Sequence, residues 1–176
     1  MRALGGSGDI DNAQALYADR ARLSASGQAF LALAIEILAP GSPPAATLFS
    51  DLQSNALRSG MGASWEDSNR SYQNMSTGLS TTAIVAYALV KHDPGSALLP
   101  DALRYLMLNR QADGGWNSTF TTAWSLLALD TWVRSTGELQ ASFSYGATLN
   151  STSIFTSQAG AGALQSETVE IPLNRL

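Results

Sequence analysis

The stretch Gln111–Leu129, QADGGWNSTFTTAWSLLAL, decides the fold that this sequence predicts. It opens with a polar, glycine-rich turn that ends in Trp116, and it continues through threonines into a segment that is apolar almost all round. Glycines permit a tight turn, and a helix that is apolar on all sides must be wrapped by neighbouring helices. The stretch has no pattern typical of a nucleophile, a metal site or a phosphate-binding loop, so we expect its role to be architectural.

Related segments recur along the chain. TTAWSLLAL at Thr121–Leu129 has a counterpart in TTAIVAYAL at Thr81–Leu89, and GQAFLALAI at Gly27–Ile35 is a looser third copy. Small residues at a fixed spacing let helices approach closely, and the apolar surroundings predict that the three segments are inner helices of one buried ring. The aligned alanines are Ala29, Ala83 and Ala123, and then Ala34, Ala88 and Ala128.

Amphipathic segments alternate with these inner ones and should pack outside them. One face of the segment after GSPP carries Leu48, Leu52 and Ala56, and one face of the segment after DPGSA carries Leu99, Ala102, Leu103, Leu106 and Arg110. The turns that follow also match, as GASW at Gly62–Trp65 and DGGW at Asp113–Trp116. A repeat of about 40 to 50 residues, each with an inner and an outer helix, predicts a helical solenoid or a closed toroid.

The hydrophobic period changes after Gly137, which we expect to end the last helix in the left-handed conformation. Apolar residues then alternate with polar or small ones from 141 to 150, as in a half-buried strand, and TSIFT and TVEIPL indicate two more strands. We therefore expect a mainly α chain, with a helical part at residues 1–138 and an antiparallel β part at residues 139–176. Because three strands make too little sheet, its other strands should lie elsewhere.

Composition limits the possible functions. The chain has 176 residues, of which 45% are hydrophobic and 14% charged, and its net charge of −4 argues against nucleic-acid binding. It has no cysteine, and its single histidine, His92, falls at a probable helix end, where we expect a capping or surface role. One histidine and scattered carboxylates cannot assemble a structural zinc site, so we expect no metal and no cofactor. We also find no signal peptide and no apolar run long enough to span a membrane.

The turn RQADGGW fits the tryptophan-and-glutamine repeat of terpene cyclases, in which Gln, Gly and Trp close successive helical hairpins. In that role the glutamine amide would cap exposed backbone groups and the tryptophan would cover a helix end. The residues that we expect to close hairpins are Trp65, Gln111, Gly114, Gly115 and Trp116. A cyclase would also need an acidic protonating cluster, for which Asp9 and Asp11 are too sparse.

A resemblance to a second family covers nearly the whole chain. The segments LSASGQAFLALAIEIL, WEDS and STTAIVAYALVKHDPGSALLPDALRYLMLNRQADGGWNSTFTTAWSLLALDTWVRSTGEL resemble bacterial alpha-2-macroglobulin. They are similar to the later part of the thioester domain of that family, which is an α/α toroid. The strands from ASFSYGATLN onward stand where the family chain leaves the toroid for a neighbouring macroglobulin-like or CUB-like β domain.

The resemblance implies a broad-spectrum endopeptidase inhibitor that traps its target. A peptidase cleaves a bait region, the molecule collapses around it, and a Cys–Gln thioester acylates an amine of the attacker. The thioester motif is Cys-x-Glu-Gln, and this sequence has no cysteine. Either the motif lies outside this chain, which the small number of repeats favours, or the protein has lost it.

The resemblance also places one loop of this chain beside the thioester. In complement-type relatives a histidine ahead of the TTA helix takes part in acyl transfer, and SYQNMSTGLSTTA places Tyr72 there, followed by Gln73, Asn74 and Met75. A tyrosine cannot form the acyl-imidazole intermediate, so the implied chemistry is direct attack by lysine amines. The alternative is that Tyr72 is an ordinary loop aromatic.

Other functions stay open. The chain could belong to an α/α toroid enzyme that acts on polyprenyl or glycan substrates, or to a repeat scaffold without chemistry. The expected partners are target endopeptidases, other domains of the parent chain and a second copy of this chain, in a periplasmic, cell-envelope or secreted setting. An open half-toroid should leave inner-helix residues partly uncovered and so favour self-association. The residues expected to be uncovered are Phe30, Leu31, Ile84 and Trp124.

Overall fold

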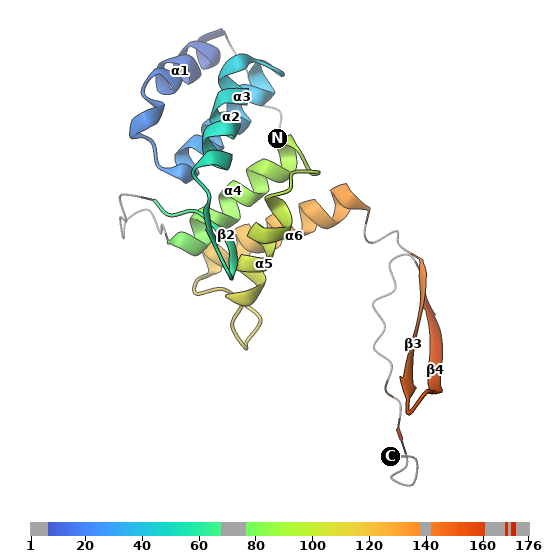
Figure 1. The fold of residues 1–176 in the computed structure, drawn as a ribbon. Helices are drawn as coiled ribbons and strands as arrows, with labels where there is room; N and C mark the ends of the chain where they lie inside the picture. Colours follow the sequence, from blue (N-terminus) through green and yellow to red (C-terminus); the bar gives the residue numbers. More distant parts are fainter. Residues whose placement is uncertain (1–6, 68–76, 138–141, 161–167, 169, 172–176) are drawn as a thin grey trace. The chain divides into compact units, whose positions relative to one another are not determined.

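The computed structural model describes residues 7–67, 77–137, 142–160, 168 and 170–171. The chain divides into two compact units, at residues 1–135 and 136–176. The first is helical and contains one short β-hairpin, and the second contains an antiparallel hairpin (Figure 1). The expectation of a mainly α chain followed by antiparallel β structure is therefore confirmed.

The helical unit has six α-helices in its described residues, and we keep for them the names inner and outer that the sequence pattern suggested. The inner helices are α2 (Ala25–Leu38), α4 (Gly78–His92) and α6 (Thr119–Thr136). The outer ones are α1 (Ser7–Ala18), α3 (Pro43–Ser54) and α5 (Leu99–Leu108), and a 3-10 turn, η1 (Arg20–Arg22), follows α1. Helix α2 packs against α1, α3 and α4, and α4 also packs against α5. Helices α3 and α4 touch only slightly.

Local sequence explains where the helices begin and end. Thr77 caps α4 through a capping box with Ser80, and the Ser24 hydroxyl accepts from the Gly27 N–H at the start of α2. Prolines stand in the first turns of α3 and α5, where their missing N–H costs nothing. Gly137 follows α6 at φ +70°, in the left-handed conformation that the sequence predicted.

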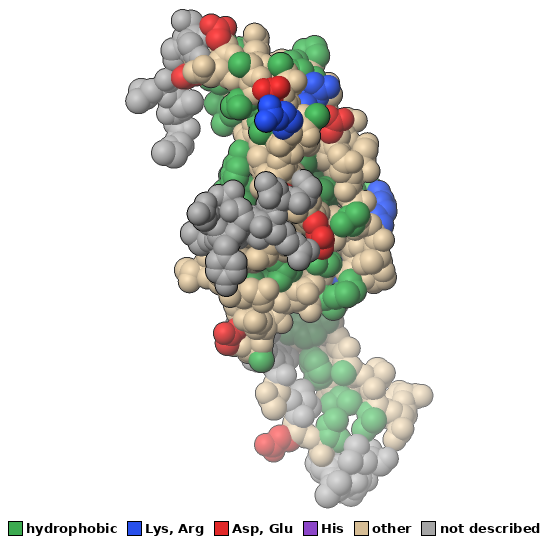
Figure 2. All heavy atoms as spheres, turned by 90° about the vertical axis from the view of Figure 1, so that its left-hand side faces the viewer, with side chains coloured by type: hydrophobic (Ala, Val, Ile, Leu, Met, Phe, Trp, Pro, Cys, Tyr) green, Lys and Arg blue, Asp and Glu red, His purple; other side chains and the backbone are tan. Residues whose placement is uncertain are grey.

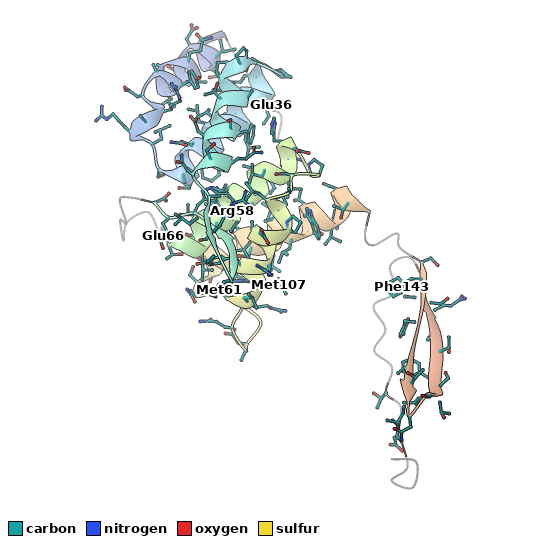
Figure 3. All side chains as sticks on the ribbon, in the orientation of Figure 1. Glu36, Arg58, Met61, Glu66, Met107 and Phe143 are labelled. Atoms are coloured by element: carbon teal, nitrogen blue, oxygen red, sulfur yellow. The ribbon has the colours of Figure 1, made fainter. Side chains whose placement is uncertain are left out.

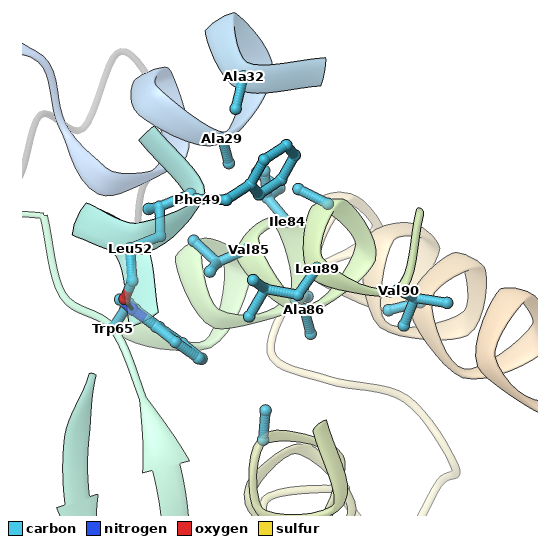
Figure 4. Close-up of a cluster of buried hydrophobic side chains, with 14 of the residues drawn as sticks. Ala29, Ala32, Phe49, Leu52, Trp65, Ile84, Val85, Ala86, Leu89 and Val90 are labelled. Carbon is cyan, nitrogen blue, oxygen red and sulfur yellow. Dashed lines mark hydrogen bonds between the residues drawn. The ribbon is translucent and has the colours of Figure 1, made fainter. Parts of the chain in front are cut away.

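The core lies around α4, which packs against α2, α3, α5 and the second strand of the short hairpin. Eleven of its fifteen residues are buried, and Figure 4 shows its apolar side chains next to those of α2 and α3. The other two inner helices are less enclosed, with four buried residues in α2 and three in α6. The sequence predicted three buried helices of one ring, and the structure buries α4 over most of its length but α2 and α6 at fewer positions.

Several predicted positions need correction. Leu31 and Ile84 are 6% and 4% exposed, so the expectation that they are uncovered is wrong, whereas Phe30 is 43% exposed and Trp124 is partly buried. Helices α3 and α5 end at Ser54 and Leu108. Ala56 and Arg110 therefore lie beyond the helices on whose faces the sequence placed them.

The sequence did not predict the short hairpin of β1 (Leu57–Ser59) and β2 (Gly62–Ser64), which pair in antiparallel register. Strand β2 packs against α5, and Gly62 explains how closely. Its φ is +128°, and a Cβ built on it would lie 2.2 Å from the carbonyl oxygen of Asp101. Only glycine allows this approach of strand to helix.

The second unit contains β3 (Phe143–Leu149) and β4 (Thr152–Ala159), which pair antiparallel with a bulge after Ala147. The first two predicted strands are confirmed, and the third, at residues 168–173, lies largely outside the described residues. One face of the hairpin carries an aromatic row, in which the rings of Phe143 and Phe155 each lie 6.0 Å from that of Tyr145. Phe143 is labelled at the start of β3 in Figure 3.

Charged side chains are sparse on the surface. Charged residues make up 14% of the chain, and in Figure 2 acidic and basic side chains lie near one another at the top of the view while few appear elsewhere. No helix in the described part of the chain is long and apolar enough to cross a membrane.

Candidate functional site

Trp65 and Trp116 close two helical hairpins with the same hydrogen bonds. Each indole is buried and donates from Nε1 over 2.7 Å to a carbonyl in the preceding outer helix, that of Leu52 in α3 or Leu106 in α5. Figure 4 shows Trp65 beside Leu52 in this position. A tryptophan in this place joins the outer helix to the chain that enters the next inner helix.

The same two tryptophans also bind the inner helix through their backbone. The Trp65 N–H donates to the Thr82 hydroxyl at 3.0 Å, and the Trp116 N–H donates to the Thr122 hydroxyl at 2.9 Å. Both threonine hydroxyls can donate in return to the tryptophan carbonyl, at 3.4 and 3.2 Å. The threonines are the second members of the two TT pairs, so the sequence repeat is also a hydrogen-bonding repeat.

The first threonine of each pair completes the match. The Thr81 hydroxyl donates to the Asp67 carboxylate at 3.0 Å, and the hydroxyls of Thr121 and Ser118 lie 3.0 Å apart. Asp67 and Ser118 each stand two residues after a tryptophan. We refer to this set of contacts as the tryptophan closure.

One closure contains an insertion that the other lacks. From tryptophan to the bonded threonine the chain separation is 17 residues in the first closure and 6 in the second, a difference of 11. The next pair of contacts locates the additional residues. Asp67 and Thr81 are 14 residues apart, and their counterparts Ser118 and Thr121 are 3 apart, which is again a difference of 11. The additional residues therefore lie between Asp67 and the start of α4. An insertion that leaves the closure intact is free to carry a function of its own.

The predicted residues Tyr72, Gln73 and Met75, and Asn74 between them, belong to this insertion and lie outside the described residues. The described residues at its two ends are well anchored. At one end, Asp67 is 7% exposed and accepts from the hydroxyls of Ser26 and Thr81, each at 3.0 Å. At the other end, Thr77 caps α4. Both ends are therefore held at the first turn of α4.

The surroundings of Asp67 suit a buried carboxylate. Its partners Ser26 and Thr81 stand in the first turns of α2 and α4, where the helix dipole favours negative charge. The Ser26 N–H also points to Asp67 Oδ1, at 3.4 Å. Through these hydrogen bonds Asp67 joins two inner helices at the point where the insertion begins.

The glycine-rich turn has the geometry of a structural element. Gly114 has φ +90°, and a Cβ there would meet the Arg110 guanidinium at 2.9 Å. Backbone bonds join the Gln111 N–H to the Gly115 carbonyl and the Gly114 N–H to the Gln111 carbonyl, both at 2.9 Å. The Gln111 amide donates to the Asn117 side chain at 3.2 Å. The expectation that this amide caps backbone groups is wrong, because the backbone of Gln111 makes those bonds.

An aromatic cluster spans the three inner helices. The Trp124 ring of α6 lies 5.4 Å from Phe30 of α2, 5.7 Å from Tyr87 of α4 and 6.4 Å from Phe120, all in edge-to-face geometry. The contact of Phe30 with Trp124 joins α2 and α6 directly, on the face of the helical unit that also carries Tyr87. Phe30 is 43% exposed, so this face offers aromatic surface to a ligand or partner.

The side chains around the closures are already engaged in contacts within the fold. The hydroxyls of Thr82 and Thr122 are engaged with backbone carbonyls, that of Thr81 with a carboxylate and that of Thr121 with the Ser118 hydroxyl. His92 is exposed, as the sequence predicted, and its ring stacks on Phe49 with centroids 3.8 Å apart. In the described part of the chain, no group of three or more metal-ligating side chains comes together.

Sequence reasoning missed three features of this region. The pairing of Asp67 with Thr81 could have been inferred from the alignment of WED with WNS ahead of the two TT pairs. The contact of Phe30 with Trp124 had no signal, because it joins helices that are not neighbours in the repeat. The insertion could have been found by counting residues between each tryptophan and its TT pair.

Comparison with known proteins does not place this chain in a family. No family model matches it, and no curated protein matches it either.

Proposed function

We propose that this chain is part of an α/α toroid in a protease-trapping protein of the alpha-2-macroglobulin type. In this proposal residues 1–138 are a non-catalytic scaffold, and residues 139–176 begin an adjoining β domain. The observation that carries the proposal is the 11-residue insertion in the first tryptophan closure. When two closures make the same bonds and one of them contains additional residues, those residues are the expected place for a functional loop.

The insertion coincides with the segment that the sequence resemblance places beside the thioester. Tyr72, Gln73 and Met75 belong to it, and its ends are held by Asp67 and by the cap of α4 at Thr77. A loop anchored at both ends can shield a reactive acyl group from water and still move when the rest of the molecule rearranges. The scaffold would therefore position the loop, and the cysteine and glutamine would come from elsewhere in the parent polypeptide.

The proposal defines partners and setting. The partners are target endopeptidases, which the whole protein would enclose, and the neighbouring domains of the parent chain. The setting is the periplasm, the cell envelope or the extracellular medium. No cofactor, metal or nucleic acid takes part.

A direct test uses the parent polypeptide with a broad-specificity endopeptidase. A trapped peptidase keeps a working active site, but large substrates cannot reach it. Cleavage of casein should therefore fall at least tenfold, while cleavage of a small peptide ester persists. As a control, the 176-residue chain without the rest of the parent should inhibit neither reaction. It should also gain no mass with methylamine, since it has no cysteine to form a thioester. A parent polypeptide that leaves casein cleavage unchanged would refute the proposal.

A second candidate, a toroid enzyme acting on polyprenyl or glycan substrates, is favoured by the aromatic cluster. Faces of aromatic rings stabilise cations and pack against apolar ligands, as the exposed edge of Phe30 beside Trp124 would allow. The same parent polypeptide distinguishes the two functions. Turnover of a polyprenyl diphosphate or an oligosaccharide, with casein cleavage unaffected, would select the enzyme.

A further inference from the structure

The short hairpin has an unpaired strand edge. Strand β1 pairs with β2 alone among the described residues, and all three of its residues are exposed. Strand β2 packs against α5, so the hairpin is held to the helical unit from one side. It stands between α3 and α4 in the sequence, away from both ends of the helical unit. An edge strand presents backbone N–H and C=O groups, which are a template for a further strand.

Exposed apolar side chains accompany this edge. Leu57 of β1 is 52% exposed, and Met61 in the turn and Met107 of α5 are each 46% exposed. The Arg104 guanidinium of α5 donates to the Gly60 carbonyl at 3.3 Å, which joins the turn to the helix that carries Met107. Figure 3 labels both methionines, Met61 at the hairpin turn and Met107 on α5. Methionine is flexible and polarisable, and it is common on surfaces that bind peptides.

Arg58 supplies a charge at the middle of the edge. It is exposed, and its side chain makes no hydrogen bond or ion pair with the described residues. Side chains alternate along a strand, so Arg58 lies on one face of the hairpin with Ala63, and Leu57 lies on the other. A strand added beside β1 would alternate in the same way. An acidic side chain next to Arg58 and an apolar one next to Leu57 would both form favourable cross-strand pairs.

The same arginine disfavours a second copy of this chain as the added strand. Two copies of a three-residue strand, paired centre to centre, would place Arg58 opposite Arg58, and like charges directly opposite destabilise a sheet. A lipid surface is also a poorer match, because it cannot form the regular ladder of hydrogen bonds that a strand edge offers. The occupant that fits backbone, charge and apolar side chains together is an extended acidic peptide.

We propose that β1 binds an extended peptide of a partner protein, in which acidic and apolar side chains alternate. The peptide backbone pairs with the free edge of β1, its carboxylates face Arg58, and its apolar side chains pack beside Leu57. Met61 and Met107 extend the apolar contact beyond the strand. This proposal does not depend on the proposed function.

Fluorescence anisotropy with the full 176-residue chain tests the proposal. The probe is a labelled octapeptide of alternating valine and glutamate, and the comparison peptide has lysine in place of glutamate. The glutamate peptide should bind about tenfold more tightly, because lysine would stand beside Arg58. A third peptide, the glutamate peptide methylated at every backbone nitrogen, keeps the side chains and loses the strand donors. Its affinity should also be about tenfold lower than that of the unmethylated peptide.

Two pairs of variants locate the site. Arg58→Glu should reverse the preference in favour of the lysine peptide, whereas Arg22→Glu, at an exposed arginine of η1, should keep it. Leu57→Ser should weaken binding of the glutamate peptide about threefold, whereas Leu126→Ser, at a leucine of α6 with similar exposure, should not. All four positions are exposed, so each variant should keep the wild-type circular dichroism.

Three results would overturn the proposal. They are a glutamate peptide that does not bind, an Arg58→Glu variant with the wild-type preference, and binding that survives backbone methylation. Binding to vesicles of anionic phospholipid in place of the peptide would also overturn it and would assign the edge to a membrane surface.

Discussion

Replacing Trp116 with alanine should destabilise the helical unit more than a typical core substitution. The indole is 2% exposed and donates to the Leu106 carbonyl at 2.7 Å. Burial of about 150–250 Å² of aromatic surface at about 25 cal/mol per Å² corresponds to about 4–6 kcal/mol, which is an upper value because the unfolded chain already buries part of it. Measured Trp-to-Ala changes in cores cost about 3–5 kcal/mol, and we expect Trp116→Ala to fall in that range.

The assay is urea unfolding followed by circular dichroism at a helical wavelength. With a slope of about 2 kcal/mol per M, a loss of 3–5 kcal/mol lowers the midpoint by about 1.5–2.5 M. Trp65→Ala should give a similar shift, because Trp65 makes the same hydrogen bonds. Trp132→Ala, at a partly buried position in α6, is the control and should shift the midpoint by less than half as much. A Trp116→Ala midpoint within about 0.5 M of wild type would refute the idea that the closure holds the repeat together.

Two further substitutions test the contacts that position the closures. Gly62→Ala should cost at least about 2 kcal/mol of folding stability, because the added Cβ would overlap the Asp101 carbonyl. Gly60→Ala is the control and should be close to neutral, because nothing lies within 4 Å of a Cβ built there. Equal urea midpoints for the two variants would contradict the close approach of β2 to α5. Asp67→Asn should cost about 1–3 kcal/mol because it weakens the hydrogen bonds from the buried Thr81 hydroxyl and the partly buried Ser26 hydroxyl. Asp113→Asn, in an exposed turn, should cost less than half of that. A thermal melt that ranks the two variants the other way would exclude the proposed anchoring.

The sequence predicted the elements whose signal is local. The helices at residues 78–92 and 119–136 stand where the two TT segments were found, and Gly137 ends the second of them. The spacing of apolar residues along a helix depends only on residues close together in the chain, so a single sequence is enough to detect it. The strand pairing at 143–159 was found for the same reason.

Burial and long-range contacts could not be predicted in the same way. Ala86 and Leu126 occupy the same place in the repeat, yet one is buried and the other is more than half exposed. Helix α5 packs on α4, whereas within the described helical unit no helix packs on α6 to a comparable extent, and this difference is not written in the local pattern. The β1–β2 hairpin was missed because its strands have three residues each, too few to show alternation.

The two closures together indicate which residues serve the fold and which are available for function. Features that recur at Trp65 and Trp116, namely the indole bond to the outer helix and the backbone bond to a threonine, are needed in any repeat and carry no information about a particular activity. Features found once are different. The insertion after Asp67 adds eleven residues while the indole bond and the backbone bond to threonine are kept, so these closure bonds do not explain it. Because the closure bonds give no reason for the insertion, a function specific to this chain has to be sought there before it is sought in the conspicuous glycine-rich turn at Gly114.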